Sequence, residues 1–125
     1  MKTISVEQIG DCKWHESAQF PNIRWKYLVD STKMRSHGVS CGIIEISIGA
    51  ELTLHHHEPQ EIYVIRAGEA LLLQATEEPK KLLKDSVIYI PESCSHGVRN
   101  IGQTSLELLW IFPTNSWEEI DYMFK

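Results

Sequence analysis

Long hydrophobic runs are missing from this 125-residue sequence. No apolar stretch approaches the roughly 18 residues that span a bilayer, so we do not expect a membrane protein. The first residues, MKTISVEQIGDCKW, hold no continuous apolar segment of signal-peptide length. Cysteine is also scarce: Cys12, Cys41 and Cys94 are widely spaced and form no CxxC pair. This pattern fits free thiols in a reducing compartment and favours a cytoplasmic protein.

Positive charge is outnumbered and dispersed. There are 12 Lys and Arg against 17 Asp and Glu, a formal net charge of −5. The basic residues are not clustered, so the phosphate backbone of a nucleic acid would be repelled and we expect no nucleic-acid partner.

Boundaries between domains are absent as well, because no Pro/Gly/Ser-rich stretch, repeat or block of charge divides the chain. We therefore expect a single domain with an N-terminal arm (1–24), a barrel (25–113) and a helical tail (114–125). A chain of this size buries enough surface to fold without a structural metal, so any metal here would serve function.

Short apolar or alternating segments separated by turn residues indicate an all-β sandwich or barrel. Strands are expected at residues 25–29, 39–48, 52–57, 62–66, 70–74, 81–83, 87–90, 97–100 and 105–112. One helix is expected in the tail SWEEIDYMF, where Ser116 and Glu119 have capping-box spacing and Trp117, Ile120 and Phe124 recur at helical intervals.

The segment GAELTLHHHEPQEIYVIRAG carries the most informative polar residues. Side chains alternate along a strand, so His55 and His57 point to one side and His56 to the other. Glu61 begins the next strand after a short connection, and His96 would come from a neighbouring strand. Three imidazoles and one carboxylate suit Fe(II), Mn(II), Ni(II), Co(II) or Zn(II) and leave coordination positions open. We expect no metal role for the remaining histidines, His15, His37 and His56.

These residues resemble two motifs of the cupin superfamily. The first motif, G(X)5HXH(X)3-4E(X)6G, is matched by Gly49, His55, His57, Glu61 and Gly68. The second, G(X)5PXG(X)2H(X)3N, is matched by Pro91, His96 and Asn100, with Asp85 and Ser93 where the family has glycines. The resemblance implies a double-stranded β-helix, or jelly-roll barrel, around one divalent metal ion. Asp tolerates a left-handed backbone better than most residues, whereas Ser93 leaves the loop before His96 open to a change of shape.

Tyr63 and several other aromatic residues bear on the reaction. Strand alternation directs Tyr63 into the same cavity as Glu61, where a nearby cation would favour its ionised form and a role as general base. The alternative, equally compatible with the sequence, is an aromatic that only fills the barrel. If Trp25, Tyr27, Tyr89 and Trp110 face the cavity, they would bind a cationic substrate such as a quaternary ammonium or a sulfonium.

The chain is also similar to a narrower family, the short bacterial cupins that act as dimethylsulfoniopropionate lyases. The resemblance runs through NIRWKYLVD, LTLHHHEPQEIYVI, SVIYIPESCSHGVRN and LELLWIFPTNSWEEIDY. It implies that the metal binds the substrate carboxylate, that Tyr63 removes the adjacent proton, and that dimethyl sulfide and acrylate result. Tyr122 matches a second active-site tyrosine of that family.

Two other functions compete with the lyase, because one fold hosts many reactions. A metal-dependent oxygenase or isomerase on a small polar substrate would use the same ligands, and a non-catalytic ligand-binding cupin would need Tyr63 and Tyr122 only to shape the pocket. The sequence does not select the metal among these ions. A homodimer is expected, because the edge strands of a small barrel must be covered, either by the N-terminal segment or by a second subunit.

Overall fold

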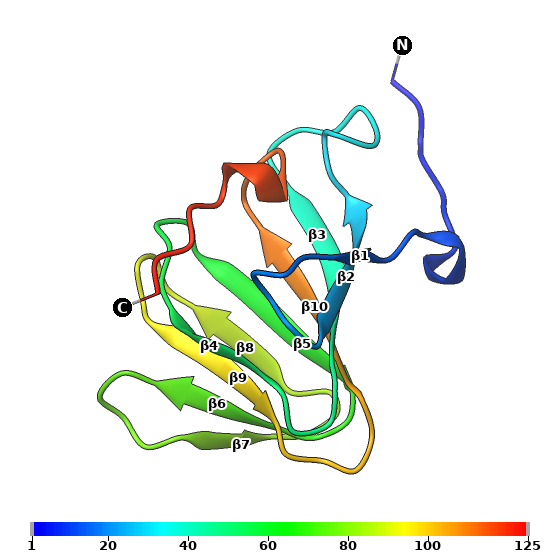
Figure 1. Ribbon diagram of the computed structural model, residues 1–125. Helices are drawn as coiled ribbons and strands as arrows, with labels where there is room; N and C mark the ends of the chain where they lie inside the picture. Colours follow the sequence, from blue (N-terminus) through cyan, green and yellow to red (C-terminus); the bar gives the residue numbers. More distant parts are fainter. Residues whose placement is uncertain (1, 125) are drawn as a thin grey trace.

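The computed structural model describes residues 2–124 and consists almost entirely of β-strands (Figure 1). The strands are β1 His15–Glu16, β2 Ile23–Val29, β3 Ser40–Ile46, β4 Glu51–His55, β5 Glu61–Ala67, β6 Ala70–Gln74, β7 Lys80–Leu82, β8 Val87–Ile90, β9 His96–Asn100 and β10 Leu106–Phe112. All of the predicted strands are confirmed, with ends that move by at most two residues. The two helices of the described segment, η1 Ile9–Asp11 and η2 Trp117–Glu119, are single 3-10 turns, and neither has the length or apolar character to span a membrane.

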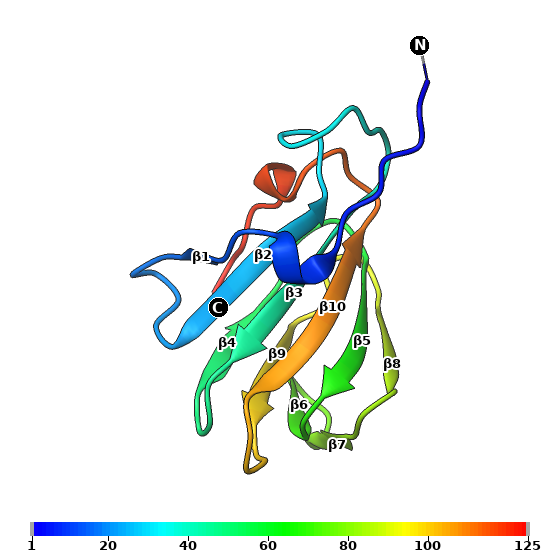
Figure 2. The same cartoon turned by 90° about the vertical axis from the view of Figure 1, so that its right-hand side faces the viewer.

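Two antiparallel sheets pack face to face (Figures 1 and 2). The larger has the order β1-β2-β3-β10-β5-β8 and the smaller β4-β9-β6-β7. Alternation along β10 shows how the core forms: Leu106, Leu108, Trp110 and Phe112 point inward and are at most 5% exposed. The residues between them face outward, so one strand supplies both a core face and a surface face. The architecture is the predicted all-β jelly roll.

The C-terminal tail differs from the expected helix. The capping box is present, because the Ser116 hydroxyl accepts a hydrogen bond from the Glu118 backbone and the Glu119 carboxylate accepts one from the Ser116 backbone. However, the helix ends after one turn at Glu119. The chain then runs extended, and Met123 exchanges two backbone hydrogen bonds of 2.9 Å with His56. The prediction of a helix across this tail was therefore wrong beyond Glu119, because the extended tail buries Ile120 and places Tyr122 against the core.

The N-terminal segment covers one edge of the larger sheet. β1 pairs with β2 through His15 opposite Trp25. Lys26, on the outer side of β2, is only 6% exposed, and its ammonium donates a hydrogen bond of 2.8 Å to the carbonyl of Ile9. The same side chain lies 4.5 Å from the ring of Trp14. The residues before β2 thus pack onto the outer face of the sheet within one chain.

Candidate metal centre

The four predicted ligands lie together at one end of the sandwich. His55 ends β4, His57 follows it, Glu61 begins β5 and His96 begins β9, and none of them is more than 2% exposed. The potential ligand atoms of the three imidazoles lie within 4.8 Å of one another. Glu61 Oε1 lies 3.1 Å from His57 Nε2 and 3.3 Å from His96 Nε2. Sequentially distant residues thus form one compact cluster of three nitrogens and a carboxylate.

Backbone carbonyls orient all three imidazole rings. In each ring the Nδ1 atom lies at hydrogen-bond distance from a main-chain oxygen two residues away, and the acceptors are Thr53 at 2.8 Å, Pro59 at 2.8 Å and Cys94 at 2.9 Å. A carbonyl accepts only, so Nδ1 carries a proton in each ring, and in His55 and His96, whose Nε2 atoms have no hydrogen-bond partner, Nε2 presents its lone pair. Metal-binding histidines use this arrangement, in which the second nitrogen is fixed by an outer partner.

The Nε2 atoms of His55 and His96 are buried and make no hydrogen bond, although Glu61 Oε1 lies 3.3 Å from His96 Nε2. Burial, reinforced by the proximity of His96, lowers the pKa of His55 from 6.5 to about 3, so that this ring is neutral at physiological pH. Buried polar atoms without partners are costly and unusual. A divalent cation bound by these nitrogens and by Glu61 would satisfy them, and the donor set suits the transition metals named above. The residues present therefore fit a metal.

The turn before β8 and the loop before His96 both have the left-handed backbone that glycine favours. Asp85 and Ser93, which replace the two glycines of the second motif, have φ values of 71° and 59°. Both lie in the left-handed region that glycine adopts most easily. The Ser93 backbone also donates a hydrogen bond of 2.9 Å to the carbonyl of His57. The loop that carries serine in place of glycine thus lies against the candidate ligand His57.

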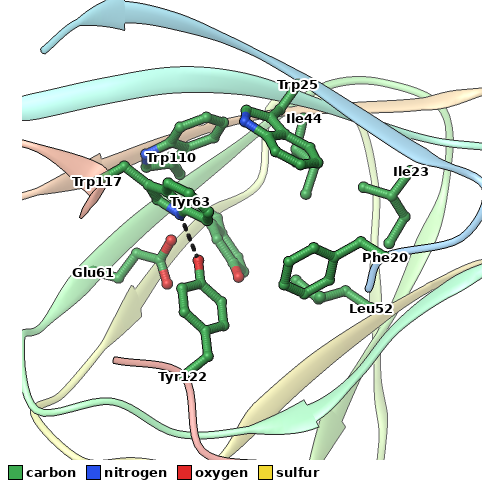
Figure 3. A pocket seen from close by; sticks show the side chains of 10 residues that line it. All are labelled: Phe20, Ile23, Trp25, Ile44, Leu52, Glu61, Tyr63, Trp110, Trp117 and Tyr122. Atoms are coloured by element: carbon green, nitrogen blue, oxygen red, sulfur yellow. Dashed lines mark hydrogen bonds between the residues drawn. The ribbon is translucent and has the colours of Figure 1, made fainter. Parts of the chain in front are cut away.

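A pocket lined mainly by aromatic side chains adjoins the carboxylate of Glu61 (Figure 3). Its lining residues are Phe20, Ile23, Trp25, Ile44, Leu52, Glu61, Tyr63, Trp110, Trp117 and Tyr122. Tyr63 comes from β5, two residues after Glu61, and Tyr122 from the extended tail. The hydroxyl groups of both tyrosines point into the pocket (Figure 3).

The protein environment raises the pKa of both phenol groups. Burial, followed by the negative charge of Glu61, raises the pKa of Tyr63 well above its ordinary value of 10.0. The same two causes raise the pKa of Tyr122. The Tyr122 ring stacks on His55 with 5.0 Å between centroids, and its oxygen accepts a hydrogen bond of 3.1 Å from Trp117 Nε1. A cation held by the histidines would oppose the rise that Glu61 causes in the pKa of both phenols.

The aromatic residues predicted to bind a cation fall into three groups. Trp25 and Trp110 line the pocket. Tyr27 lies behind it and packs against Trp110 and Trp117, with centroids 6.4 and 5.9 Å apart. Tyr89 does not reach the pocket: it is 60% exposed on the outer face of β8, and its hydroxyl donates to Gln60. The alternation of β8 explains this placement, because Ile88 and Ile90 take the inward positions.

Phe20 and Trp117 line the pocket although the sequence pattern did not single them out as site residues. In the sequence, the spacing of Trp117 from Ile120 and Phe124 indicates only a helical face. Phe20 lies in the connection before β2, and its ring packs edge-on against Tyr122, with 6.0 Å between centroids. The density of aromatic residues in the tail was the available signal for Trp117, whereas no pattern marks Phe20.

Comparison with known proteins identifies the family. The family model described as "Cupin domain" matches residues 42–112, which is more than half of the chain. The chain belongs to the cupin family. This match includes all four residues of the cluster, and it agrees with the resemblance to the two sequence motifs.

Two curated relatives are similar over most of this cupin. The dimethylsulfoniopropionate lyase DddW of Ruegeria pomeroyi is 28% identical over 105 residues, which cover 84% of this chain and 68% of the lyase. The uncharacterized protein MJ1618 of Methanocaldococcus jannaschii is 31% identical over 80 residues, which cover 62% of this chain and 63% of that protein. The chain therefore spans about two thirds of the length of these relatives.

Solved structures confirm the architecture. The polyketide cyclase RemF from Streptomyces resistomycificus aligns with a TM-score of 0.80 at 16% identity, over 89% of this cupin and 80% of the cyclase. The DMSP lyase DddQ from Ruegeria pomeroyi aligns with a TM-score of 0.69 at 19% identity, over 85% of this cupin and 58% of the lyase. At these identities the likeness concerns the fold alone. Both structural neighbours are enzymes, but they carry out different reactions on one architecture.

Proposed function

We propose that this cupin is a metal-dependent lyase that cleaves dimethylsulfoniopropionate to dimethyl sulfide and acrylate. The observation that carries the proposal is the placement of two phenols, Tyr63 and Tyr122, in one pocket with Glu61, whose carboxylate contacts the histidine cluster. The similarity to the lyase DddW over 84% of the chain supports the same reaction class.

The metal would be held by the Nε2 atoms of His55, His57 and His96 and by the carboxylate of Glu61. When bound, a divalent cation supplies positive charge that neutralises the substrate carboxylate and makes the adjacent C–H bond more acidic. His55 stays neutral at the pH of the reaction because its pKa is low, so that its lone pair remains available.

Tyr63 acts as the general base. It reacts as the phenolate, which the positive charge of a cation held by the ligand cluster would favour against burial and the charge of Glu61. The phenolate oxygen receives the proton from the carbon next to the carboxylate, and the electron pair of that C–H bond becomes the double bond of acrylate. The carbon–sulfur bond breaks, and its electron pair leaves with dimethyl sulfide. The reaction needs no oxidant, and the proton on Tyr63 passes to water to complete the cycle.

Tyr122 and the tryptophans orient the substrate. The hydrogen bond from Trp117 Nε1 fixes the hydroxyl of Tyr122 at the pocket. Trp25, Trp110 and Trp117 present apolar rings that suit the methyl groups and positive charge of a sulfonium. A cation over such a ring gains roughly 0.5 to 2 kcal/mol. The deep burial of the ligand cluster also keeps bulk water away from the reacting carbon.

The test is headspace gas chromatography for dimethyl sulfide on protein loaded separately with Fe(II), Mn(II), Ni(II) and Zn(II). We expect gas release from the wild type and a loss of roughly 10²- to 10⁴-fold in Tyr63→Phe, as for removal of a general base. Tyr89→Phe is the matched control, because it removes a phenol from the outer face, and it should keep full activity.

Three outcomes would contradict the lyase. No release with any metal, together with Fe(II)-dependent oxygen consumption, would favour a cupin oxygenase, and turnover of another small polar substrate without oxygen would favour an isomerase. Binding of dimethylsulfoniopropionate without turnover, unchanged in Tyr63→Phe, would favour a non-catalytic ligand-binding cupin.

A further inference from the structure

Two thiols from distant parts of the chain line one hollow on the outer face of the larger sheet. Cys12 directly follows η1 in the N-terminal arm, and Figure 2 shows η1 in front of β2 and β3. Cys41 lies in β3, where its neighbours on both sides are buried on the inner face. The hollow between the arm and the sheet is lined by both thiols together with Ile9, Leu28, Val29 and Met34.

The ammonium group of Lys33 lies beside Cys12. Its Nζ atom is 3.6 Å from Cys12 Sγ, and it also donates hydrogen bonds to the carboxylate of Glu7 at 2.6 Å and to the carbonyl of Tyr27 at 2.8 Å. The two shorter bonds hold the ammonium in place. A positively charged donor stabilises the negative charge that a sulfur carries when it reacts as a nucleophile. Cys12 is therefore the thiol of this pair that is placed to react first.

Cys41 has the properties of a second, resolving thiol. Burial raises the pKa of Cys41, and the Val29 backbone and the charge of Lys33 offset only part of this rise. β3 pairs with β2 on one side and with β10 on the other, so Cys41 is fixed in the sheet. A resolving thiol attacks the sulfur that has already been oxidised, and for this it needs proximity more than high reactivity of its own.

The N-terminal arm is the part of this arrangement that can move. Residues 2–8 are exposed and belong to no helix or strand, and η1 is a single turn. Side-chain contacts, such as the pair between Glu7 and Lys33, hold this stretch to the sheet. Disulfide formation requires the two sulfurs to approach to about 2 Å. A shift of the arm across the hollow can bring Cys12 to Cys41 while β3 stays in place.

We propose that Cys12 and Cys41 form a reversible disulfide that links the N-terminal arm to β3 when the protein is exposed to hydrogen peroxide. The Cys12 sulfur attacks one peroxide oxygen, the O–O bond breaks, water leaves and a sulfenic acid remains. The Cys41 sulfur then attacks the sulfenic sulfur, the S–O bond breaks and a second water leaves. One peroxide is reduced to two waters, and the two thiols are oxidised to one disulfide.

The disulfide would lie directly behind the aromatic pocket. Gly42, the residue after Cys41, lies against the ring of Trp110 on the inner face of the sheet. Tyr27, whose carbonyl accepts the bond from Lys33, packs against Trp110 as well. Disulfides in reducing compartments are usually transient and serve to sense oxidants, and this one would act on the backbone that carries the pocket. The inference concerns regulation and does not depend on the proposed lyase activity.

The test is peptide mapping by mass spectrometry on the full-length protein, treated with hydrogen peroxide and digested without reductant. We expect linked peptides that contain Cys12 and Cys41 and that dithiothreitol separates. A bond that closes residues 12–41 should also raise the unfolding temperature by roughly 10 °C. Cys41→Ala should abolish both effects. Cys94→Ala is the matched control, because Cys94 is exposed and lies outside the hollow, and it should keep both.

The rate of oxidation tests the role of the ammonium. Lys33→Gln should slow formation of the disulfide roughly tenfold, because a hydrogen bond from a charged donor is worth more than one from a neutral donor. Lys81→Gln is the control, since this lysine is exposed and lies outside the hollow. Equal rates in the two lysine variants would overturn the proposal. So would Cys12 and Cys41 that stay reduced while Cys94 reacts, that oxidise without a link between them, or that link two separate chains.

Discussion

The indole nitrogen of Trp117 lies 3.1 Å from the phenol oxygen of Tyr122, to which it donates a hydrogen bond. The Tyr122 ring stacks in turn on His55, a predicted metal ligand. The backbone N–H of Trp117 donates a second hydrogen bond, of 2.9 Å, to the Asp30 carboxylate. A continuous set of contacts therefore connects the buried Asp30, between β2 and β3, with Tyr122, which packs on the candidate metal site.

Trp117→Phe should lower kcat for the proposed reaction by about two- to tenfold and raise KM by a smaller factor, because a phenyl ring binds a cation less well than an indole ring. The substitution keeps one aromatic ring and removes the five-membered ring of the indole with its N–H, and the lost hydrogen bond contributes roughly 0.5 to 1.5 kcal/mol. Steady-state kinetics would test this, with Trp14→Phe as the control, because Trp14 lies outside the pocket and stacks with Arg24. An equal fall in both variants would argue against a positioning role for Trp117.

Asp30→Asn should reduce the free energy of unfolding at pH 7 by about 1 to 3 kcal/mol, because the amide cannot accept every bond that the carboxylate accepts. Burial alone would raise the pKa of Asp30, but hydrogen bonds from Thr32 and from the Trp117 backbone outweigh it and hold the pKa below 3.8. A carboxyl whose folded pKa is depressed stabilises the protein above its unfolded pKa, and this contribution is lost as the pH falls through the folded value.

The difference between wild type and Asp30→Asn should therefore be full at pH 7 and shrink below about pH 4. Urea unfolding at pH 7 and pH 3.5 measures both values. Asp121→Asn is the control, since Asp121 is exposed, and it should leave stability unchanged at either pH. A deficit that stays constant with pH would show that Asp30 does not act through its charge.

Most of the fold and the ligand cluster follow from local rules that the sequence displays directly. Strand alternation predicted the inward direction of Glu61 and Tyr63 and the clustering of His55 with His57, because period-two geometry does not depend on distant contacts. The same rule predicts that Tyr89 alternates with Ile88 and Ile90 in β8, but it does not tell which of the two faces points into the pocket. Which face of a strand is buried depends on the rest of the fold.

The tail shows where local pattern is insufficient. Ser116 and Glu119 do form the predicted capping box, yet the turn ends at once, because tertiary contacts of the following residues outweigh their helical spacing. Asp85 and Ser93 show the opposite case. Their left-handed backbone is retained although the family glycines are gone, and the sequence alone left the shape of the Ser93 loop open.

Metal addition should stabilise the chelator-treated protein, by about 2.7 kcal/mol at a free metal concentration 100 times the dissociation constant. His57→Ala removes a predicted ligand itself. It should weaken metal affinity more than the loss of a residue that only orients a ligand, which typically costs 10- to 100-fold. His56→Ala is the matched control: this histidine is the sequence neighbour of two ligands but lies outside the cluster, and its contact with Met123 is through the backbone. Thermal unfolding with and without Ni(II) and Zn(II) would measure the shift. Equal losses in the two variants would contradict the ligand assignment.

The metal-free protein should lose stability as the pH falls below about 6.5. The pKa of His55 is about 3 in the folded protein and 6.5 in the unfolded chain. Between pH 6.5 and pH 3 the unfolded chain therefore binds a proton that the folded protein does not, and this difference favours unfolding. The loss amounts to roughly 5 kcal/mol at most by pH 3. Chemical unfolding of chelator-treated protein at several pH values would show the slope, and His55→Gln should flatten it. A variant with the same slope as the wild type would place the titrating group elsewhere.

Gly42→Ala should be strongly destabilising although it adds a single methyl group. A Cβ at Gly42 would collide with the ring of Trp110 and with the carbonyl of Lys26, so β3 could accept it only if the tryptophan moved. Overpacking of a tight core costs about 1 to 3 kcal/mol. Trp110 also lines the pocket, so the variant should lose substrate affinity together with stability. Gly10→Ala is the control, because nothing lies within 4 Å of the added carbon. Thermal unfolding of both variants decides the point: if Gly42→Ala melts with the wild type, the close approach of Trp110 to β3 is not a constraint on this fold.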